Sequence, residues 1–276
     1  MPRVSLPSSS LQSPRLRHQR GVALFVVIVF VMLSMLLALW ASRTSMFNEM
    51  VVGNDADYQR AFEAAQALIQ DAELDIRGEK ADGSDCRIPT VMDCRGGRSG
   101  IAQIPLQMEG KDGAAELWAD LEGITSGPRC LNALCLKRTG RQDFWNNTND
   151  KTDPLVDFTL TEMMMPNIGA RYGEYSGATL SADAADPSGN PILRDRSANN
   201  RGGWYWIEVL PYDTNADKSA LIAGGPNNLP LKMTPNVVYR ITAVAHGRKL
   251  RSEGGVDVPV TQAVIQQTYA RQKLMD

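Results

Sequence analysis

The chain has 276 residues, of which 43% are hydrophobic and 22% are charged, and its formal net charge is −2. This composition is typical of a globular protein of one or two domains with one additional apolar segment. The charge is unevenly placed, because the first 21 residues hold four arginines and no acid, so the remainder is acidic. An acidic remainder without a basic run gives no electrostatic case for a nucleic-acid groove.

The longest apolar stretch covers residues 22–41. Between Val22 and Trp40 its only polar residue is Ser34, and it contains no charge. Twenty helical residues span about 30 Å, the thickness of the hydrocarbon core of a bilayer. The alternative is a buried core helix of a soluble protein, but the flanking residues favour a membrane. The arginines before the stretch predict a cytoplasmic N-terminus, which places everything after Ala41 outside the inner membrane, in a periplasm-like compartment.

The residues before this stretch, 1–21, are rich in Ser, Pro and Arg and lack apolar periodicity. They are predicted to form a disordered, positively charged leader. A secretory signal peptide has a shorter apolar core, followed by small residues at a cleavage site, and no such site follows here. Instead a single glycine, Gly21, stands at the junction between the leader and the apolar stretch.

This junction resembles the class III leader of type IV pilins and pseudopilins in its order Gln19-Arg20-Gly21-Val22-Ala23-Leu24. The resemblance implies that a prepilin peptidase cuts between Gly21 and Val22 on the cytoplasmic side and that the new N-terminus is methylated. A residue without a Cβ lets a protease approach the backbone closely. The resemblance also implies that the apolar helix packs beside helices of neighbouring pilins, and the expected packing residues are Val26, Phe30, Leu33 and Leu37.

One position departs from the major pilins, which carry Glu at the fifth position after the cut. Here that position is Val26. A subunit in the body of a filament that lacked this Glu would leave its neighbour's ammonium group unpaired in apolar surroundings, which is costly. The top subunit of a filament has no such neighbour to satisfy. Val26 therefore points to a minor subunit near the tip, although other minor pilins could tolerate the change.

After Ser42 the sequence becomes amphipathic, with an interruption at Gly53-Asn54. The apolar residues that recur at helical spacing are Tyr58, Ala61, Phe62, Ala65, Leu68, Ile69, Ala72 and Ile76. The residues expected elsewhere on the helix surface are Glu63, Gln66, Gln70 and Asp71. Gly78 is the expected C-terminal stop. The pattern predicts one continuous helix over residues 22–77, and the alternative is a membrane helix followed by a separate helix.

The same region resembles one subgroup of the family, the PilX-type minor pilins. The matching features are Arg43-Thr44, Glu49-Met50, Gly53-Asn54 and Ala61-Phe62-Glu63-Ala64-Ala65, with Gln66 where Glu is usual. The resemblance covers residues 19–73, about a fifth of the chain. It implies the type IV pilin fold and, as partners, the prepilin peptidase, other minor pilins, the major pilin and a tip adhesin.

Four cysteines lie in the middle of the chain, which is rich in Gly, Pro, Asn, Asp and Ser. In an exported domain four cysteines predict two disulfides, and of three connectivities the local pairs Cys86–Cys94 and Cys130–Cys135 are favoured. Zinc is the competing interpretation. Its usual short Cys pairs and histidines are missing around these cysteines, so no metal or other cofactor is expected.

Two further segments of the middle region have an unusual composition. Residues 143–153 are dense in oxygen-bearing side chains, so calcium is an alternative to a solvated turn, although the EF-hand order is missing. Residues 163–166 read Met-Met-Met-Pro, and packing is favoured over a partner contact. Residues 117–121 fit either a short strand or a helix. The sequence does not assign a role to residues 79–203.

Three C-terminal stretches have the composition of strands: residues 204–210, 237–246 and 262–269. In the second, Val237, Tyr239, Ile241, Ala243 and Ala245 alternate with Val238, Arg240, Thr242, Val244 and His246. The Gly254-Gly255 segment is expected to join the last two stretches as a long hairpin loop. The predicted fold class is α+β, in which a three- or four-stranded antiparallel sheet buries one face on the helix of residues 58–76.

No enzyme motif is present, and only two histidines occur, of which His246 is expected at a surface or edge. The chain is thus predicted to comprise a leader (1–21), a transmembrane helix (22–41), an amphipathic continuation (42–78) and a periplasmic head (79–276). The expected function is that of a minor pilin in a tip or priming complex that supports pilus assembly, and hence twitching motility, adhesion or DNA uptake. The alternatives are a tip pseudopilin of type II secretion and an uncut membrane anchor that displays a periplasmic binding domain.

Overall fold

The structure is a computed structural model that describes residues 20–86, 94–105, 113–125, 127–138, 142–147, 158–180, 189–211 and 237–271. The chain divides into two compact units, Met1–Val52 and Gly53–Asp276. Residues 1–19 of the expected leader lie outside the described residues, as do residues 148–153 of the oxygen-rich segment.

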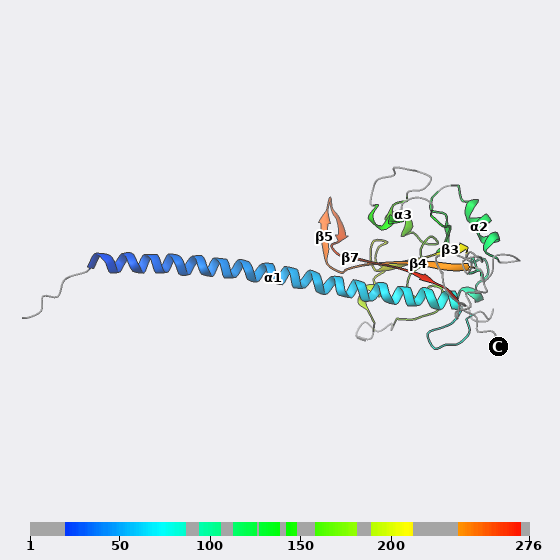
Figure 1. Cartoon of the computed structure of the whole chain (residues 1–276), viewed down its shortest axis with the longest axis horizontal. Helices are drawn as coiled ribbons and strands as arrows, with labels where there is room; N and C mark the ends of the chain where they lie inside the picture. The colour runs from blue at the N-terminus through cyan, green and yellow to red at the C-terminus, as the bar shows by residue number, and fades with distance from the viewer. Residues whose placement is uncertain are drawn as a thin grey trace, which may run out of the picture. The chain divides into compact units, whose positions relative to one another are not determined.

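The first element, α1, is a single helix over Arg20–Arg77 (Figure 1). It is continuous through Gly53 and Asn54, so the prediction of one helix is confirmed and the alternative of two is not. In the first unit its large apolar side chains are exposed from Val22 to Val52. This is the one helix among the described residues that is long and apolar enough to cross a membrane.

The helix ends at the glycine that the sequence predicts. Gly78 has a φ of 68°, a left-handed conformation that is cheap only for glycine. Its N–H donates to Asp75 O at 3.1 Å, and the Glu79 N–H donates to Leu74 O at 3.1 Å. These two bonds are those of a Schellman motif, which satisfies carbonyl groups that the end of the helix would otherwise leave unpaired.

In the second unit, one stripe of α1 is buried. Its apolar members are Ala61, Ala64, Ala65, Leu68, Ile69, Ala72 and Ile76. Two assignments made from the sequence are wrong. Tyr58 is 43% exposed, and Asp71 is 1% exposed instead of lying on the surface. Asp71 falls on the buried stripe because it lies three residues after Leu68 and four before Asp75, which is buried too.

The remaining elements are mostly short. The helices are η1 (Arg95–Gly97), α2 (Ala114–Glu122), η2 (Phe144–Asn146), α3 (Leu160–Met163) and α4 (Pro191–Arg194). The strands are β1 (Cys130–Leu131), β2 (Leu134–Cys135), β3 (Gly203–Pro211), β4 (Val237–His246), β5 (Leu250–Glu253), β6 (Val256–Pro259) and β7 (Gln262–Tyr269). The stretch 117–121 is therefore part of helix α2.

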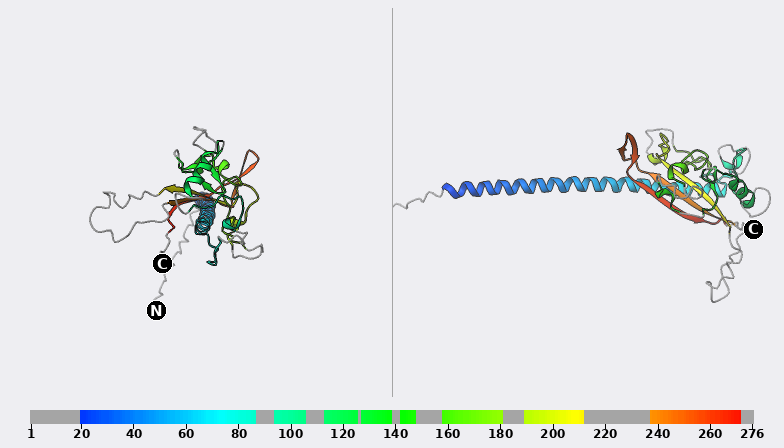
Figure 2. Two further views of the ribbon diagram at one scale, coloured as in Figure 1. Left: turned by 90° about the vertical axis from the view of Figure 1, so that its right-hand side faces the viewer. Right: turned by 90° about the horizontal axis from the view of Figure 1, so that it is seen from above.

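The main sheet has five strands in the order β1-β2-β3-β4-β7. The three long strands are antiparallel and match the predicted stretches, with β3 paired to β4 and β4 to β7. The expectation of three or four strictly antiparallel strands is corrected by β2, which pairs parallel to β3. The Gly254-Gly255 segment is the turn of a separate two-stranded hairpin, β5-β6, which stands out from the main sheet (Figure 2).

Both faces of the sheet are covered. The side chains of Val237, Tyr239, Ile241, Ala243 and Ala245 pack with the buried stripe of α1, as the alternation in β4 predicts. On the opposite face, where α3 lies in Figure 1, a second core contains Phe144, Met163, Met164, Trp204 and Trp206. The head therefore has three layers instead of two.

The second core also corrects the expectation for His246, which is 6% exposed. Its Nε2 lies 3.3 Å from the Sδ of Met164. Burial lowers the pKa of His246 to about 4, and the charges of Arg171 and Arg201 add to this effect. Met163 and Met164 are buried too, whereas Met165 is 41% exposed, so packing is the role of two of the three methionines.

Leu68 tests the contact between α1 and the sheet. Its side chain is fully buried. Its Cδ1 packs so closely on Gly203 in β3 that any side chain at position 203 would collide with it. We expect Leu68→Ala to lower the free energy of unfolding by about 2–5 kcal/mol, the usual cost of such a cavity. Gln66→Ala, at an exposed position of the same helix, is the control and should change it by less than about 0.5 kcal/mol. Urea unfolding followed by fluorescence measures the free energy of unfolding of both variants. Equal losses in Leu68→Ala and Gln66→Ala would contradict the contact between Leu68 and the sheet.

Candidate functional site

The first unit contains the four residues that the sequence predicts for helix packing. The predicted packing residues Val26, Phe30, Leu33 and Leu37 are all exposed, by 43%, 69%, 53% and 65%. Their spacing of four, three and four residues places them along one side of α1. An exposed apolar surface of this kind is stable only in lipid or against another apolar surface. The peptide bond between Gly21 and Val22 lies in the first turn of α1.

In the second unit, three buried aspartates attach α1 to the rest of the head. Asp57, Asp71 and Asp75 are each at most 5% exposed. Asp57 and Asp75 are 18 residues apart, which is five turns, and Asp71 lies one turn before Asp75. All three carboxylates therefore project from the stripe that faces the head. A buried carboxylate is costly unless donors satisfy its oxygens, so each one depends on the groups around it.

Asp57 accepts hydrogen bonds from the segment between β4 and β5 and from Thr261, which lies between β6 and β7. The N–H of Arg248 donates to Oδ1 at 2.9 Å, the N–H of Lys249 donates to Oδ2 at 3.3 Å, and the hydroxyl of Thr261 donates to Oδ2. Burial alone would raise the pKa of Asp57. The hydrogen bonds from Thr261, Arg248 and Lys249 and the charge of Arg60 outweigh burial and lower this pKa.

Asp71 binds the loop of residues 172–178. The N–H of Gly173 donates to Oδ2 at 2.7 Å, and the hydroxyl of Ser176 donates to Oδ1. Burial raises the pKa of Asp71 to about 7, against the lowering effect of these two hydrogen bonds. Gly173 has a φ of 75°, and a Cβ there would overlap the carbonyl oxygen of Ala178. Only glycine therefore fits where the loop meets the helix.

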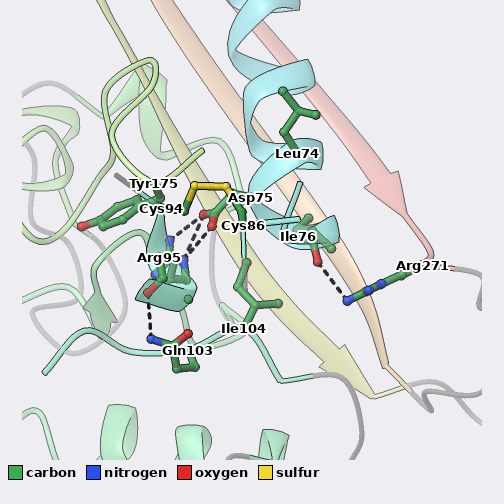
Figure 3. Close-up of a pocket in the computed structure, with 12 residues that line it drawn as sticks. Leu74, Asp75, Ile76, Cys86, Cys94, Arg95, Gln103, Ile104, Tyr175 and Arg271 are labelled. Carbon is green, nitrogen blue, oxygen red and sulfur yellow. Dashed lines mark hydrogen bonds and ion pairs between the residues drawn. A yellow bond between two sulfur atoms is a disulfide. The ribbon is translucent and has the colours of Figure 1, made fainter. Parts of the chain in front are cut away.

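Asp75 forms a buried ion pair with Arg95 (Figure 3). The Nε of Arg95 donates to Oδ1 at 2.8 Å, and Nη2 donates to Oδ2 at 2.7 Å, so the pair is bidentate. Arg95 also donates to the carbonyl oxygens of Ala102 and Asn132, and its guanidinium lies 4.0 Å from the ring centre of Tyr175. The adjoining pocket has a volume of about 80 Å³, which is below the usual size of a ligand site.

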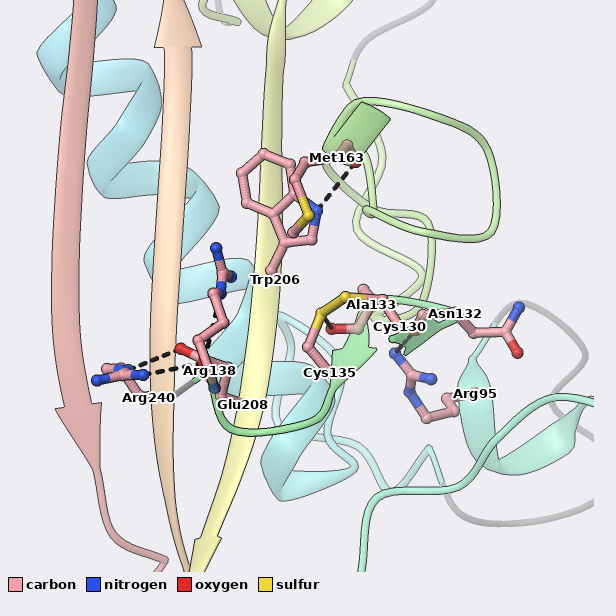
Figure 4. Close-up of a disulfide and its surroundings, with 10 residues drawn as sticks. All are labelled: Arg95, Cys130, Asn132, Ala133, Cys135, Arg138, Met163, Trp206, Glu208 and Arg240. Atoms are coloured by element: carbon pink, nitrogen blue, oxygen red, sulfur yellow. Dashed lines mark hydrogen bonds and ion pairs between the residues drawn. A yellow bond between two sulfur atoms is a disulfide. The ribbon is translucent and has the colours of Figure 1, made fainter. Parts of the chain in front are cut away.

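The structure contains both disulfides that the sequence analysis favours. Cys86–Cys94 lies beside the Asp75–Arg95 pair, and its sulfurs lie 3.6 and 3.5 Å from the carbonyl oxygen of Ser176. Cys130–Cys135 closes the β1-β2 hairpin (Figure 4). The tight turn of this hairpin places Asn132 and Ala133 at positive φ. The second disulfide thus fixes the short hairpin that pairs with the main sheet through β2.

A second polar cluster lies on the face of the sheet opposite α1 (Figure 4). Glu208 is 2% exposed and accepts from Arg240 at 2.7 and 2.9 Å, while the Nε of Arg138 lies 3.6 Å away. Arg138 stacks on Phe144 at 3.8 Å, and burial lowers its pKa to about 10. Among the described residues, no group of three or more His, Cys, Asp or Glu side chains is placed to hold a metal ion.

Sequence reasoning missed the three aspartates as attachment points. A signal was present, since each of the three lies three or four residues from an apolar member of the stripe. An acid at such a position predicts a partner inside the protein. The partners themselves come from segments 20 to more than 190 residues away, and hydrophobic periodicity does not identify them.

Together these observations define a protein with one long N-terminal helix, apolar and exposed in its first half, that carries a disulfide-containing α+β head. Two family models match the chain. The model for the C-terminal part of the type IV pilus assembly protein PilX matches residues 131–271, and the PilX N-terminal model matches residues 20–69. The chain therefore belongs to the PilX family of type IV pilus assembly proteins. Searches of curated proteins and of solved structures return no match.

Asp71 predicts how the stability of the head depends on pH. Its pKa is about 7 in the folded state and near 3.8 in the unfolded chain. A raised folded pKa means that its contribution to stability is fully present below pH 3.8 and is lost as the pH rises through 7. We therefore expect Asp71→Asn to flatten the decrease in melting temperature between pH 5 and pH 8, measured by circular dichroism.

Asp57→Asn is the matched control, because the pKa of Asp57 shifts in the opposite direction. The lowered pKa means that the Asp57 carboxylate stabilises the folded state at pH values above its unfolded pKa. The Asp57→Asn protein should therefore have a lower melting temperature at pH 7 than the unchanged protein. Asp57→Asn should not change how steeply the melting temperature falls between pH 5 and pH 8. If the melting temperature of Asp71→Asn falls as steeply with pH as that of the unchanged protein, the raised pKa of Asp71 is contradicted.

Proposed function

We propose that this protein is a minor pilin that enters the type IV pilus at or near its tip, as part of a priming complex with other minor pilins. In that role it supports assembly of the filament and hence twitching motility, adhesion or DNA uptake. Membership of the PilX family supports a part in pilus assembly, which is a structural role and implies contacts with other pilus components. The position in the filament is the further step.

The observation that carries the proposal is the apolar side chain of Val26 in a helix that has no charge from Val22 to Trp40. In a filament body, the N-terminal ammonium of one subunit needs a carboxylate from its neighbour, because an unpaired charge between apolar helices is costly. Val26 supplies no carboxylate. A subunit at the tip avoids this cost, because no further subunit stands above it.

The membrane and processing steps follow from the same helix. Its apolar first half supports a single-pass anchor in the inner membrane before assembly, with the head in the periplasm. Once a peptidase has removed residues 1–21, the side of α1 that carries Val26, Phe30, Leu33 and Leu37 packs beside other pilin helices. Such packing relies on close van der Waals contact, because lipid tails are as apolar as the helix.

The first test is the mass of the mature protein. We expect the intact mass of protein extracted from membranes to correspond to a chain that begins at Val22, with one added methyl group. Gly21→Leu should leave the leader in place, because a side chain at that position keeps the backbone away from the peptidase. Retention of residues 1–21 in the unchanged protein would contradict the pilin assignment and favour an uncut anchor.

The second test separates the tip position from the family assignment. We expect Val26→Glu to appear along the length of the pili in immunogold labelling, because the carboxylate can pair with a neighbouring ammonium. Val27→Glu, which adds the same charge one position later, is the control and should stay scarce. Expression levels must match. Labelling of Val26→Glu that is as scarce as that of the unchanged protein would show that Val26 does not confine the protein to the tip.

A further inference from the structure

The second border of the main sheet is a long strand without the usual protection of an edge. Among the described strands β7 pairs with β4 alone, and Figure 4 shows it as the outermost strand, at the left. Natural edge strands are usually protected by charged side chains, prolines or bulges. The residues of β7 include no charge and no proline, and their register with β4 runs from Gln262 to Tyr269 without a bulge.

The bonding of β3 determines which backbone groups of β7 point outward. In an antiparallel pair, residues that exchange both backbone hydrogen bonds alternate with residues whose N–H and C=O groups point to the other side. Tyr205 in β3 exchanges its two bonds with Ala170, at 2.9 and 3.0 Å, on the side away from β4. The next residue, Trp206, therefore bonds to its partner in β4, which is Thr242.

The same alternation continues across β4 to the outer strand. The two neighbours of Thr242 in β4 point away from β3 and bond to their partners in β7, Ile265 and Gln267. Among the residues of β7 that alternate with these, Gln266 and Thr268 are exposed. The residues whose N–H and C=O groups point out of the sheet are Gln262, Val264, Gln266 and Thr268. Donors and acceptors at every second residue are what another strand needs in order to pair.

The side chains of β7 that face α1 are incompletely covered. In β4, Tyr239 and Ala243 lie in the same row and are fully buried. Their partners in β7, Tyr269 and Ile265, pack against the same core but are only half-buried. The core therefore ends in two apolar side chains that remain partly in water. A strand added outside β7 would cover both of them, provided that its own side chains on this face are apolar.

We propose that the outer edge of β7 binds an extended segment of another pilus subunit, which becomes a further strand of the main sheet. In this mode of binding, backbone hydrogen bonds supply affinity and side chains at alternate positions supply selectivity. The row formed by Ile265 and Tyr269 selects a segment with apolar side chains at every second position. The choice of a pilus subunit as the partner rests on the proposed assembly role, whereas strand addition at this edge rests on the sheet alone.

Symmetry argues against a second copy of this chain as the partner. A two-fold axis that joins two β7 edges in one sheet pairs the strands antiparallel. The buried stripe of α1 packs on the same face of the joined sheet in both copies, so the two stripes would run in opposite directions. Chains that are anchored in one membrane by the N-terminal part of α1 run in the same direction. The added strand therefore comes from a different pilus subunit.

The first test uses the full chain, purified in a non-ionic detergent, and amide hydrogen exchange resolved to single residues. In the free protein the amides of Gln266 and Thr268 should exchange faster than those of Ile265 and Gln267, because the latter two are bonded to β4. Exchange of all four amides at equal rates would overturn the proposal, because the edge would then already be paired.

The probe for binding is a synthetic peptide in which Val alternates with Thr between terminal lysines. It should slow exchange at Gln266 and Thr268 by about tenfold or more, in a saturable way. The same peptide with N-methyl groups on its central amides should bind at least about tenfold more weakly, because it cannot donate backbone hydrogen bonds. A peptide with Thr in place of every Val should also bind at least about tenfold more weakly, because it leaves the apolar row uncovered. Absence of protection, or binding that either control peptide equals, would overturn the proposal.

Variants then test the edge in cells. Gln266→Pro removes one outward N–H and should keep the head folded, because proline is tolerated where the N–H of an edge strand faces solvent. Gln266→Ala is the matched control, because it removes the same side chain and keeps the N–H. At matched membrane levels, Gln266→Pro should reduce surface pili to the number seen in a strain that lacks the gene, and Gln266→Ala should assemble pili normally. Equal numbers of pili in the two variants would overturn the proposal.

A third variant, Gln267→Pro, separates pairing from folding. Its N–H is bonded to β4, so this variant should have a much lower melting temperature than the unchanged protein. If Gln266→Pro lowers the melting temperature as much, the 266 N–H does not point outward and the proposal is overturned. A dimer of the free protein that Gln266→Pro dissociates would also overturn it, because the partner would be a second copy. Normal pili in the strain that lacks the gene would contradict the assembly role alone, and peptide binding would still decide whether β7 accepts a strand.

Discussion

The buried ion pair between Asp75 and Arg95 connects the parts of the head more than any other single interaction. Through it, the last turns of α1 contact η1, and through the carbonyl oxygens of Ala102 and Asn132 the same guanidinium reaches two further segments. A buried ion pair is stable only when hydrogen bonds satisfy both of its charged groups. Loss of either partner would leave the other charge buried and uncompensated. The long helix therefore does more than cover the sheet. It carries the acids around which the loops of the head are arranged.

These acids also explain why one helix can serve in two surroundings. In its first half α1 has apolar side chains on every side, so that no direction is preferred until lipid or another helix contacts it. In its second half the apolar residues narrow to one stripe, and Asp57, Asp71 and Asp75 lie within that stripe. Apolar contact alone would allow the helix to slide along or rotate on the sheet. Three carboxyl groups with specific hydrogen-bond donors fix a single position, since a shift would leave each of these buried polar groups without its partners.

Much of the architecture could be predicted from the sequence, because it follows from local patterns. The end of α1 at Gly78 and the three long strands depend on a left-handed glycine and on short runs of β-branched and aromatic residues. What could not be predicted depends on contacts between distant segments. The parallel pairing of β2 with β3 involves two residues of each strand, and the burial of His246 depends on Met164, which lies 82 residues earlier. Local composition carries no information on such pairs, and it placed Asp71 on the wrong side of the helix.

The small β1-β2 hairpin has a consequence for how copies of this head behave at close quarters. A long strand at the border of a sheet exposes a row of backbone donors and acceptors that invites another chain to pair with it. On one border of the main sheet, the long strand β3 pairs at Ile207 and Glu208 with the two-residue strand β2. The Cys130–Cys135 disulfide joins the two ends of the hairpin to which β2 belongs. The strand outside it, β1, is equally short and leads directly into the turn. This border therefore offers almost no template for edge-to-edge aggregation, even where pilus subunits are crowded together.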